Sequence, residues 1–405
     1  MRNRRLIEFL TALGAAMSSA GDATTFITRA LERIGQAYGL RDLRVSAGPT
    51  LLILRYAEEE VAIVDLTTSS PVDLRLAQVS EIYRLLADAE AGRVEPEKGI
   101  QRLHETLTRK ARFGAPVGIA GLALISGGIS LVLLPSLPAL LICCSLGGLV
   151  GIIKLMAGRV PALWPLVPVV SASMVAAIGF LLIDAGLKAS AAGVLLPPLA
   201  VFLPGAAITV AMIELSAGDI VSGGSRLAFG GARLLLLVLG VVIAAQAVSV
   251  DTLSSTQEGL PLSPLARTLG VVAFTAGVCL HFDAPRGSFP WLLLVVGAAW
   301  GAQQGSDVVL GSYLSAAFGG AVMVIVAQMV ASRSGAPPLI VSYTPAFWLL
   351  VPSSLGLRSL AELTQGTAPE ALSDLLLMIL TMIAIALGML LGLFISGNRQ
   401  MYELP

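Results

Sequence analysis

Apolar segments of about 20 residues follow one another from about residue 113 to the end of the chain. Because a helix needs about 20 apolar residues to cross hydrocarbon about 30 Å thick, a segment of this length is long enough for one crossing. The segments lie near residues 114–134, 138–157, 163–184, 190–216, 228–249, 264–282, 289–303, 308–331, 338–360 and 372–396. The pattern predicts an α-helical polytopic membrane protein with about ten transmembrane helices.

The first 112 residues have a mixed pattern that predicts a small α/β domain. Large apolar side chains recur every three or four residues at the start, as on an amphipathic helix: Leu6, Phe9, Leu10, Leu13 and Met17. Glu8 and Thr11 interrupt this run, so we expect a cytosolic helix and not a signal peptide. Further helices are expected at 22–38, 72–91 and 95–112, with strands at 43–47, 50–56 and 61–66.

The charges divide the chain at the same place. Residues 1–113 hold 16 of the 26 Lys and Arg and 15 of the 26 Asp and Glu. We therefore expect a cytosolic domain at 1–112, a first five-helix membrane half at 113–250 and a second at 251–405. The formal net charge of zero averages two unlike parts, and no basic patch predicts nucleic-acid binding.

Basic residues are unequally shared between the alternate connections of the ten segments. On the side of the N-terminal domain are Lys154, Arg159, Arg226, Arg233, Arg286, Arg333 and Arg399, and opposite are Lys188, Arg267 and Arg358. The positive-inside rule then predicts that both termini of this multi-pass protein are cytoplasmic. The three cysteines lie within apolar segments without metal-ligand spacing, so neither a disulfide framework nor a metal site is expected.

A weak internal repeat links residues 195–219 with 343–367, at an offset of 148. The matching pairs are Pro197 with Pro345, Pro204 with Pro352, Glu214 with Glu362, Leu215 with Leu363 and Gly218 with Gly366. Each copy falls in the fourth segment of a five-segment half. An odd number of crossings turns the second half upside down, which predicts the inverted repeats that are typical of transporters.

Prolines interrupt the apolar helix in both copies, at Pro197-Pro198 and Pro204-Gly205 in the first and at Pro345 and Pro352 in the second. Broken helices expose backbone polar groups, which membranes tolerate only where protein or a wet cavity satisfies them. Half-helix ends also supply dipoles suited to a carboxylate or an ammonium, and an amino acid has both. The alternative explanation for these prolines is a helix kink that serves packing and has no role in binding.

Acids and hydroxyls follow the first break at helical spacing: Thr209, Glu214, Asp219 and Ser222. An acid within a membrane is costly to bury unpaired and therefore indicates function. Glu214 and Asp219 also lie near a predicted cytoplasmic end, where an ion pair with Arg226 or Arg233 is the alternative explanation.

The segment PGAAITVAMIELSAGDIVSGGSRL at 204–227 resembles the signature of the threonine/serine exporter family. The shared features are Pro204, Gly205, Thr209, Glu214, Gly218, Asp219, Ser222, Gly223 and Arg226. The N-terminal SSAGDATTFITRALERIGQAYGL is also similar to that family, so the resemblance covers nearly the whole chain. Val351-Pro352-Ser353 departs from the Pro-Gly expected in the second copy.

The resemblance implies a transporter, not an enzyme, that exports threonine and serine across the cytoplasmic (inner) membrane by proton antiport without a cofactor. It implies substrate binding at Pro204, Gly205, Thr209, Ser222 and Pro352, and proton coupling at Glu214 and Asp219. Gly218, Gly223, Arg226 and Glu362 would support them. The expected partners are the amino acid, protons and the bilayer, with homo-oligomerisation left open.

Two other function classes can be weighed against transport. An intramembrane hydrolase is disfavoured, because no histidine in the membrane part is placed to activate Ser222 and the segment with Asp184 lacks a neighbouring tyrosine. An amino-acid channel or facilitator, or another membrane protein with a cytosolic sensor domain, remains the alternative, since broken helices also build channels.

Overall fold

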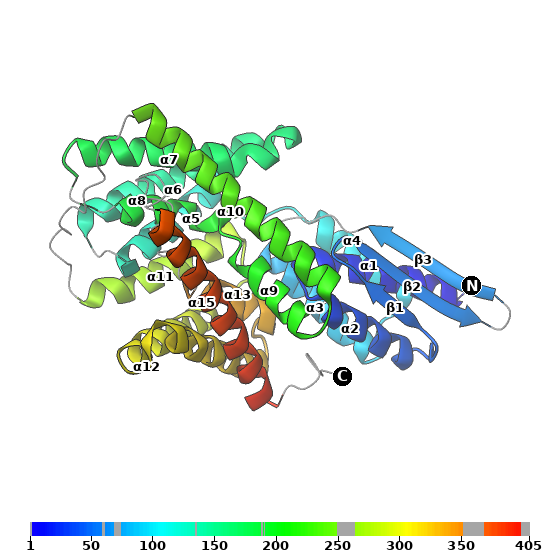
Figure 1. The fold of residues 1–405 in the computed structure, drawn as a ribbon. Coiled ribbons are helices and arrows are strands. Elements are labelled where there is room, and N and C mark those ends of the chain that lie inside the picture. Colours follow the sequence, from blue (N-terminus) through cyan, green and yellow to red (C-terminus); the bar gives the residue numbers. More distant parts are fainter. Residues whose placement is uncertain are drawn as a thin grey trace.

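The computed structural model describes residues 2–58, 61–68, 74–133, 136–187, 189, 191–248, 264–350 and 368–397. Strands and four helices form the N-terminal part, and the remaining helices gather beside it (Figure 1). Residues 109–114 join the two parts, and residues far apart in sequence meet where the parts touch, such as Leu76 and Phe282.

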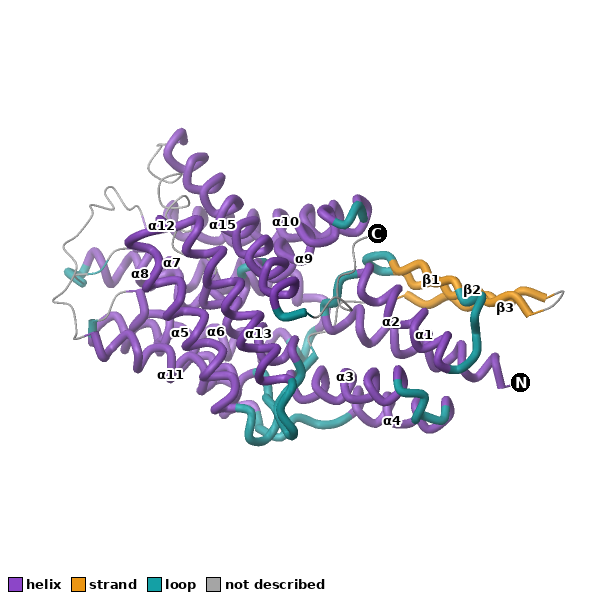
Figure 2. The backbone as a smooth tube through the Cα atoms, turned by 90° about the horizontal axis from the view of Figure 1, so that it is seen from below, coloured by secondary structure: helices purple, strands orange, loops and turns teal. Residues whose placement is uncertain are grey.

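Three strands and four helices make up the N-terminal part. They are α1 (Arg2–Ala20), α2 (Thr24–Ala37), β1 (Arg44–Ala47), β2 (Leu51–Glu58), β3 (Val61–Thr68), α3 (Leu76–Glu90) and α4 (Pro96–Thr108). The sheet is antiparallel in the order β1-β2-β3. Helices α1 and α2 lie between the sheet and α3 with α4 (Figure 2). The periodic apolar face of α1 is fully buried there, because it meets both the sheet and the outer helices.

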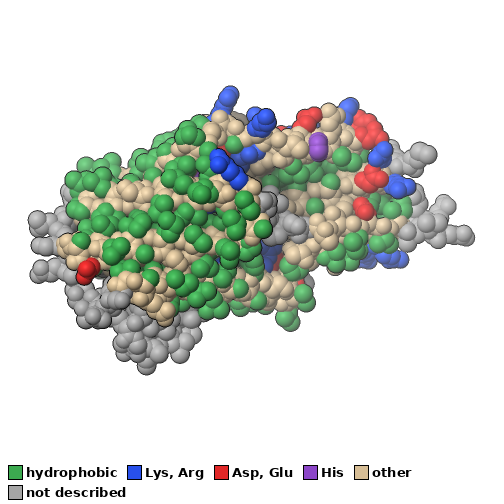
Figure 3. All heavy atoms as spheres, turned by 90° about the horizontal axis from the view of Figure 1, so that it is seen from above, with side chains coloured by type: hydrophobic (Ala, Val, Ile, Leu, Met, Phe, Trp, Pro, Cys, Tyr) green, Lys and Arg blue, Asp and Glu red, His purple; other side chains and the backbone are tan. Residues whose placement is uncertain are grey.

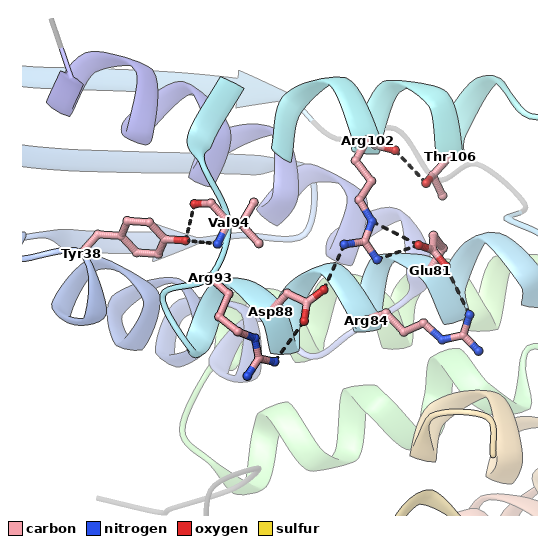
Figure 4. Close-up of polar contacts among 8 residues, drawn as sticks. All are labelled: Tyr38, Glu81, Arg84, Asp88, Arg93, Val94, Arg102 and Thr106. Atoms are coloured by element: carbon pink, nitrogen blue, oxygen red, sulfur yellow. Dashed lines mark hydrogen bonds and ion pairs between the residues drawn. The ribbon is translucent and has the colours of Figure 1, made fainter. Parts of the chain in front are cut away.

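Ion pairs hold α3 against α4 on the outer side of this part (Figure 4). Arg102 donates to Glu81 at 2.7 Å and to Asp88 at 3.0 Å, and Arg93 also donates to Asp88 at 3.0 Å. These hydrogen bonds lower the pKa of the Asp88 carboxyl. The pairs are exposed to solvent and each contributes little alone, so the buried apolar contacts provide most of the stability.

The predicted apolar segments are helical over most of the residues that the structure describes, with a break at Leu203 and Pro204. The elements are α5 (Ala115–Leu133), α6 (Leu137–Ala157), η1 (Pro161–Leu166), α7 (Val167–Asp184), α8 (Ala191–Leu199), η2 (Ala200–Phe202), α9 (Gly205–Ser216), α10 (Ile220–Val248), α11 (Pro264–His281), α12 (Phe289–Ala331), α13 (Leu339–Leu350) and α15 (Ala368–Ile395). Five helices among the described residues are long and apolar enough to cross a membrane, or six if the bent pair α8–α9 forms one span. The membrane class is thus confirmed, and ten crossings stay a prediction.

Helix α12 is a hairpin of two arms, but its break lies at Gly311 and not at the predicted connection 304–307, which is helical. Gly311 has φ +72° and ψ 167°, which breaks the helix. A Cβ on Gly319 would lie 3.1 Å from Cβ of Gln303, although a straight helix would separate these residues by about 24 Å. Ser315 also donates to Asp307 across the turn at 3.1 Å. The two arms therefore run side by side.

Large apolar side chains cover the outside of the helical part, while charged side chains gather toward the N-terminal part (Figure 3). Leu235, Val308 and Phe394 are 68%, 93% and 71% exposed. Soluble proteins rarely expose so much contiguous apolar surface, so this surface fits contact with lipid.

Helices α5 and α11 cross through two reciprocal pairs of glycines. A Cβ on Gly121 would lie 2.9 Å from the carbonyl oxygen of Gly277, and a Cβ on Gly277 would lie 2.6 Å from that of Gly121. A Cβ on Gly128 would lie 2.7 Å from the carbonyl oxygen of Gly270, and a Cβ on Gly270 would lie 2.7 Å from that of Gly128. The helices are therefore antiparallel, and small residues permit this close packing.

A second pair of contacts recurs at the offset of 148 found in the sequence. Gly240 in α10 approaches the carbonyl oxygen of Val169 in α7, and Gly388 in α15 approaches that of Ala317 in α12. Two glycines that lie 148 residues apart therefore make the same kind of contact with carbonyl oxygens that also lie 148 residues apart.

The start of α3 in the N-terminal part contacts the loop that follows α11. The backbone N–H groups of Leu76 and Ala77 donate to the carbonyl oxygens of Phe282 and Asp283 at 2.9 and 3.1 Å. The Asp283 carboxylate accepts from the backbone N–H of Arg112 at 3.0 Å and lies 3.9 Å from the Arg75 guanidinium. Free helix N–H groups thus bind the loop that follows α11.

Candidate functional site

The predicted helix break is present between α8 and α9, which meet at an angle of 58°. Pro197 and Pro198 lie inside α8, and Pro204 immediately precedes Gly205, the first residue of α9. Proline lacks the N–H that a continuous helix requires, so this run of prolines accounts for the bend. The break predicted at Pro345 is absent, because Pro345 lies inside the continuous helix α13. Pro352 and Glu362 lie outside the described residues.

A tight turn joins α9 to α10 and explains two of the predicted supporting residues. Gly218 has φ +82°, a conformation that favours glycine, and ends α9. Asp219 then accepts a hydrogen bond from the backbone N–H of Ser222 at 3.1 Å and so caps α10. This cap begins α10 at Ile220, eight residues before the predicted segment at 228–249. A Cβ on Gly223 would lie 2.7 Å from the carbonyl oxygen of Ala211, so this glycine allows α9 and α10 to pack closely.

Glu214 lies at the centre of the site and is completely buried. Its Oε2 lies 3.1 Å from Nε of Arg226, which confirms the ion pair considered from the sequence. Arg233 instead places its guanidinium over the Phe229 ring, 5.5 Å from the ring centroid. A carboxylate inside the protein is costly unless it is paired, and Arg226 provides that partner.

The remaining partners of these acids come from the N-terminal part, at the start of α2. The backbone N–H and hydroxyl of Thr24 lie 3.0 and 3.1 Å from Oε1 of Glu214. The same hydroxyl lies 2.5 Å from Oδ2 of Asp219. The acids predicted from the membrane part are therefore covered by a residue from the beginning of the chain.

A contact across the same boundary also runs in the opposite direction, from the Arg226 side chain of α10 to the backbone of Asp22 in the N-terminal part. Nη2 of Arg226 donates to the carbonyl oxygen of Asp22 at 2.7 Å. The Asp22 carboxyl accepts a hydrogen bond from the Tyr83 hydroxyl. Burial raises the pKa of Asp22 to about 7, although the Tyr83 hydrogen bond and the charge of Arg226 both act to lower it.

Not every predicted site residue joins this cluster. Ser222 contributes its backbone N–H and is buried at the start of α10. Thr209 is buried in α9, and its hydroxyl has no hydrogen-bond partner among the residues that the structure describes. Pro204 and Gly205 lie at the helix break, away from the acids along α9.

Sequence reasoning missed Asp22, Thr24 and Tyr83 as site residues, although a signal exists. The tetrapeptide Ser-Ala-Gly-Asp occurs at both 19–22 and 216–219. In each copy the glycine has positive φ, +92° at Gly21 and +82° at Gly218. In each copy the backbone N–H of the aspartate also donates a hydrogen bond to the carbonyl oxygen of the residue five positions earlier. Two identical helix turns therefore face one another across the boundary.

Comparison with known proteins places both turns within one matched region. The family model for threonine/serine exporters matches residues 8–248. A pheromone-regulated membrane protein 10 from Candida glabrata is 27% identical over 219 residues, which cover 49% of this chain. That region spans only 27% of the yeast protein. No solved structure matches the chain.

Proposed function

Because this chain belongs to the threonine/serine exporter family, we propose that it exports threonine, serine and related small amino acids across the cytoplasmic membrane. The observation that carries the proposal is the buried cluster of Glu214, Asp219 and Arg226 beside a broken helix. A zwitterionic amino acid needs an acid for its ammonium and a base for its carboxylate. The cluster offers both.

The same acids are our candidates for proton coupling. Glu214 is completely buried with one basic partner, and Asp219 shares the Thr24 hydroxyl with it. An acid in such a place can release its proton only when a cation or water compensates its charge. We propose that Glu214 or Asp219 takes up a proton as the amino acid leaves. Inward proton flow then drives export, which makes the protein an antiporter.

Alternating access would come from rocking of the two halves as inverted repeats. The reciprocal glycine pairs between α5 and α11 support this arrangement, because helices related by a two-fold axis meet through equivalent residues. The matching approaches of Gly240 to Val169 and of Gly388 to Ala317 support it as well. Helix α9 packs against α13 and α15, so the acids lie close to the second half.

The proposed orientation has both termini in the cytoplasm. The N-terminal part carries most of the charge and contacts the α9–α10 turn and the loop after α11. Arg226 lies in the second turn of α10, just after the first of these connections, and Arg286 lies in the second. The positive-inside rule assigns both residues to the cytoplasm. The acids then lie at the inner end of the substrate path.

Uptake of labelled threonine into inside-out proteoliposomes tests the function, with and without an inside-acid proton gradient. Accumulation above the external concentration that depends on the gradient is the expected result. Entry that only equilibrates would replace the antiporter with the channel or facilitator alternative. Entry of neither threonine nor serine would overturn the substrate assignment.

A further inference from the structure

Thr24 reaches the acids with the same atoms that a free threonine could use. Its nitrogen and Oγ1 both lie within 3.1 Å of Oε1 of Glu214, and its Oγ1 lies 2.5 Å from Oδ2 of Asp219. The fragment from the nitrogen through Cα and Cβ to the hydroxyl oxygen is identical in L-threonine and L-serine. A free β-hydroxy amino acid can therefore reproduce this set of hydrogen bonds.

The cluster also lacks positive charge. Two carboxyl groups, from Glu214 and Asp219, share one hydroxyl and have one guanidinium, from Arg226, beside them. The neutral N–H of Thr24 contributes a donor without a charge, whereas the ammonium of a free amino acid would contribute both. One hydroxyl proton also cannot serve two carboxylates at once, while an ammonium has three protons to share. The site is thus better suited to a free amino acid than to Thr24.

Arg226 provides the remaining requirement, a partner for the substrate carboxylate. Its Nη2 now donates to the carbonyl oxygen of Asp22, a contact that ends when the turn between α1 and α2 leaves. The donor is then available to a carboxylate, which accepts a stronger, charge-assisted hydrogen bond.

From these contacts we propose that the α1–α2 turn, residues 21–24, is a tethered substrate mimic that occupies the amino-acid site formed by Glu214, Asp219 and Arg226. The inference rests on the proposed function and identifies its recognition site. The substrate ammonium binds Glu214, its β-hydroxyl binds Asp219 and its carboxylate binds Arg226. Substrate and turn exclude one another, so the N-terminal part must withdraw before the amino acid binds.

Binding of labelled L-threonine to the purified full-length protein tests the proposal. Thr24→Val keeps the branched shape but removes the hydroxyl, which weakens the competing turn. The expected result is a decrease of about ten- to hundredfold in the Kd for threonine, as loss of one hydrogen bond to a charged group predicts. Thr25→Val is the matched control, because its side chain forms no hydrogen bond among the described residues. An unchanged Kd in Thr24→Val would overturn the proposal.

Displacement of the turn gives a second, independent test that does not alter Thr24. Ala23 is buried in the turn, so Ala23→Cys, with the three native cysteines replaced by alanine, should react slowly with a soluble maleimide. Saturating L-threonine should accelerate labelling about tenfold, and L-valine, which lacks the hydroxyl, should not. Equal rates with and without threonine would contradict displacement.

The two proposals fail in different ways. If the wild-type protein binds neither threonine nor serine, the proposed function is wrong and this inference with it. If the wild-type protein transports threonine while Thr24→Val and the maleimide rates show no effect, only the mimic is wrong.

Discussion

Arg226, in the second turn of α10, donates a hydrogen bond to the carbonyl oxygen of Asp22, which lies 204 residues earlier in the chain. The same guanidinium neutralises Glu214. One side chain therefore connects the N-terminal part to the acids proposed for transport, and any movement of the turn changes the surroundings of those acids.

Removal of Arg226 should leave a buried carboxylate without its charge partner. We expect Arg226→Gln to lower the free energy of unfolding by about 3–5 kcal/mol, the usual result of breaking one side of a buried pair. Thermal unfolding in detergent measures this loss. Arg233→Gln is the control, because Arg233 contacts the Phe229 ring and no carboxylate among the described residues. Equal effects of the two variants would contradict the assigned ion pair.

Asp22 should make docking of the turn depend on pH. Its pKa is about 7 in the folded protein and 3.8 in the unfolded chain, so the folded state holds the extra proton between these values. Stability contributed by protonated Asp22 is thus complete below pH 4 and falls by about 1.4 kcal/mol per pH unit until pH 7. Asp22→Asn should remove this slope from the unfolding free energy. Identical slopes in both proteins would show that Asp22 does not titrate in this range.

Neutralising the central acid should uncouple transport from the proton gradient. Glu214→Gln keeps the size of the side chain but cannot exchange a proton, so gradient-driven accumulation of threonine should be lost. Asp184→Asn is the control, since Asp184 is exposed at the end of α7. Wild-type accumulation by a correctly inserted Glu214→Gln protein would exclude Glu214 as the coupling residue and leave Asp219.

The crossing of α5 and α11 should not tolerate an added methyl group. A Cβ on Gly128 would lie 2.5 Å from the backbone nitrogen of Phe274, and backbone atoms cannot move aside readily. We expect Gly128→Ala to destabilise the protein by about 1–3 kcal/mol through overpacking. Gly297→Ala in α12 should be neutral or stabilising, because nothing lies within 4 Å of that position. Unfolding measurements on the two variants compare them directly.

The helices, the strands and the break before Pro204 could be predicted from local pattern, because periodicity and proline act over a few residues. The ion pair between Glu214 and Arg226 could also be predicted, because the two residues lie close together in the sequence. The contact of Thr24 with Glu214 spans 190 residues, and the apolar pattern indicates that a face is buried without indicating what covers it. The repeated Ser-Ala-Gly-Asp tetrapeptide links the two turns in the sequence, but a short repeat does not by itself predict that its copies touch.

The α1–α2 turn is covalently attached to the site it occupies, and this has a consequence for when export begins. A tethered group competes as though it were present at a fixed concentration, on the order of millimolar for a short flexible link. On the proposed assignment, cytoplasmic threonine displaces Thr24 only above a threshold that depends on this effective concentration and on how much better the free amino acid fits the site. The protein would then behave as an overflow valve with a built-in threshold, silent at low amino-acid levels and active only when the cell holds an excess.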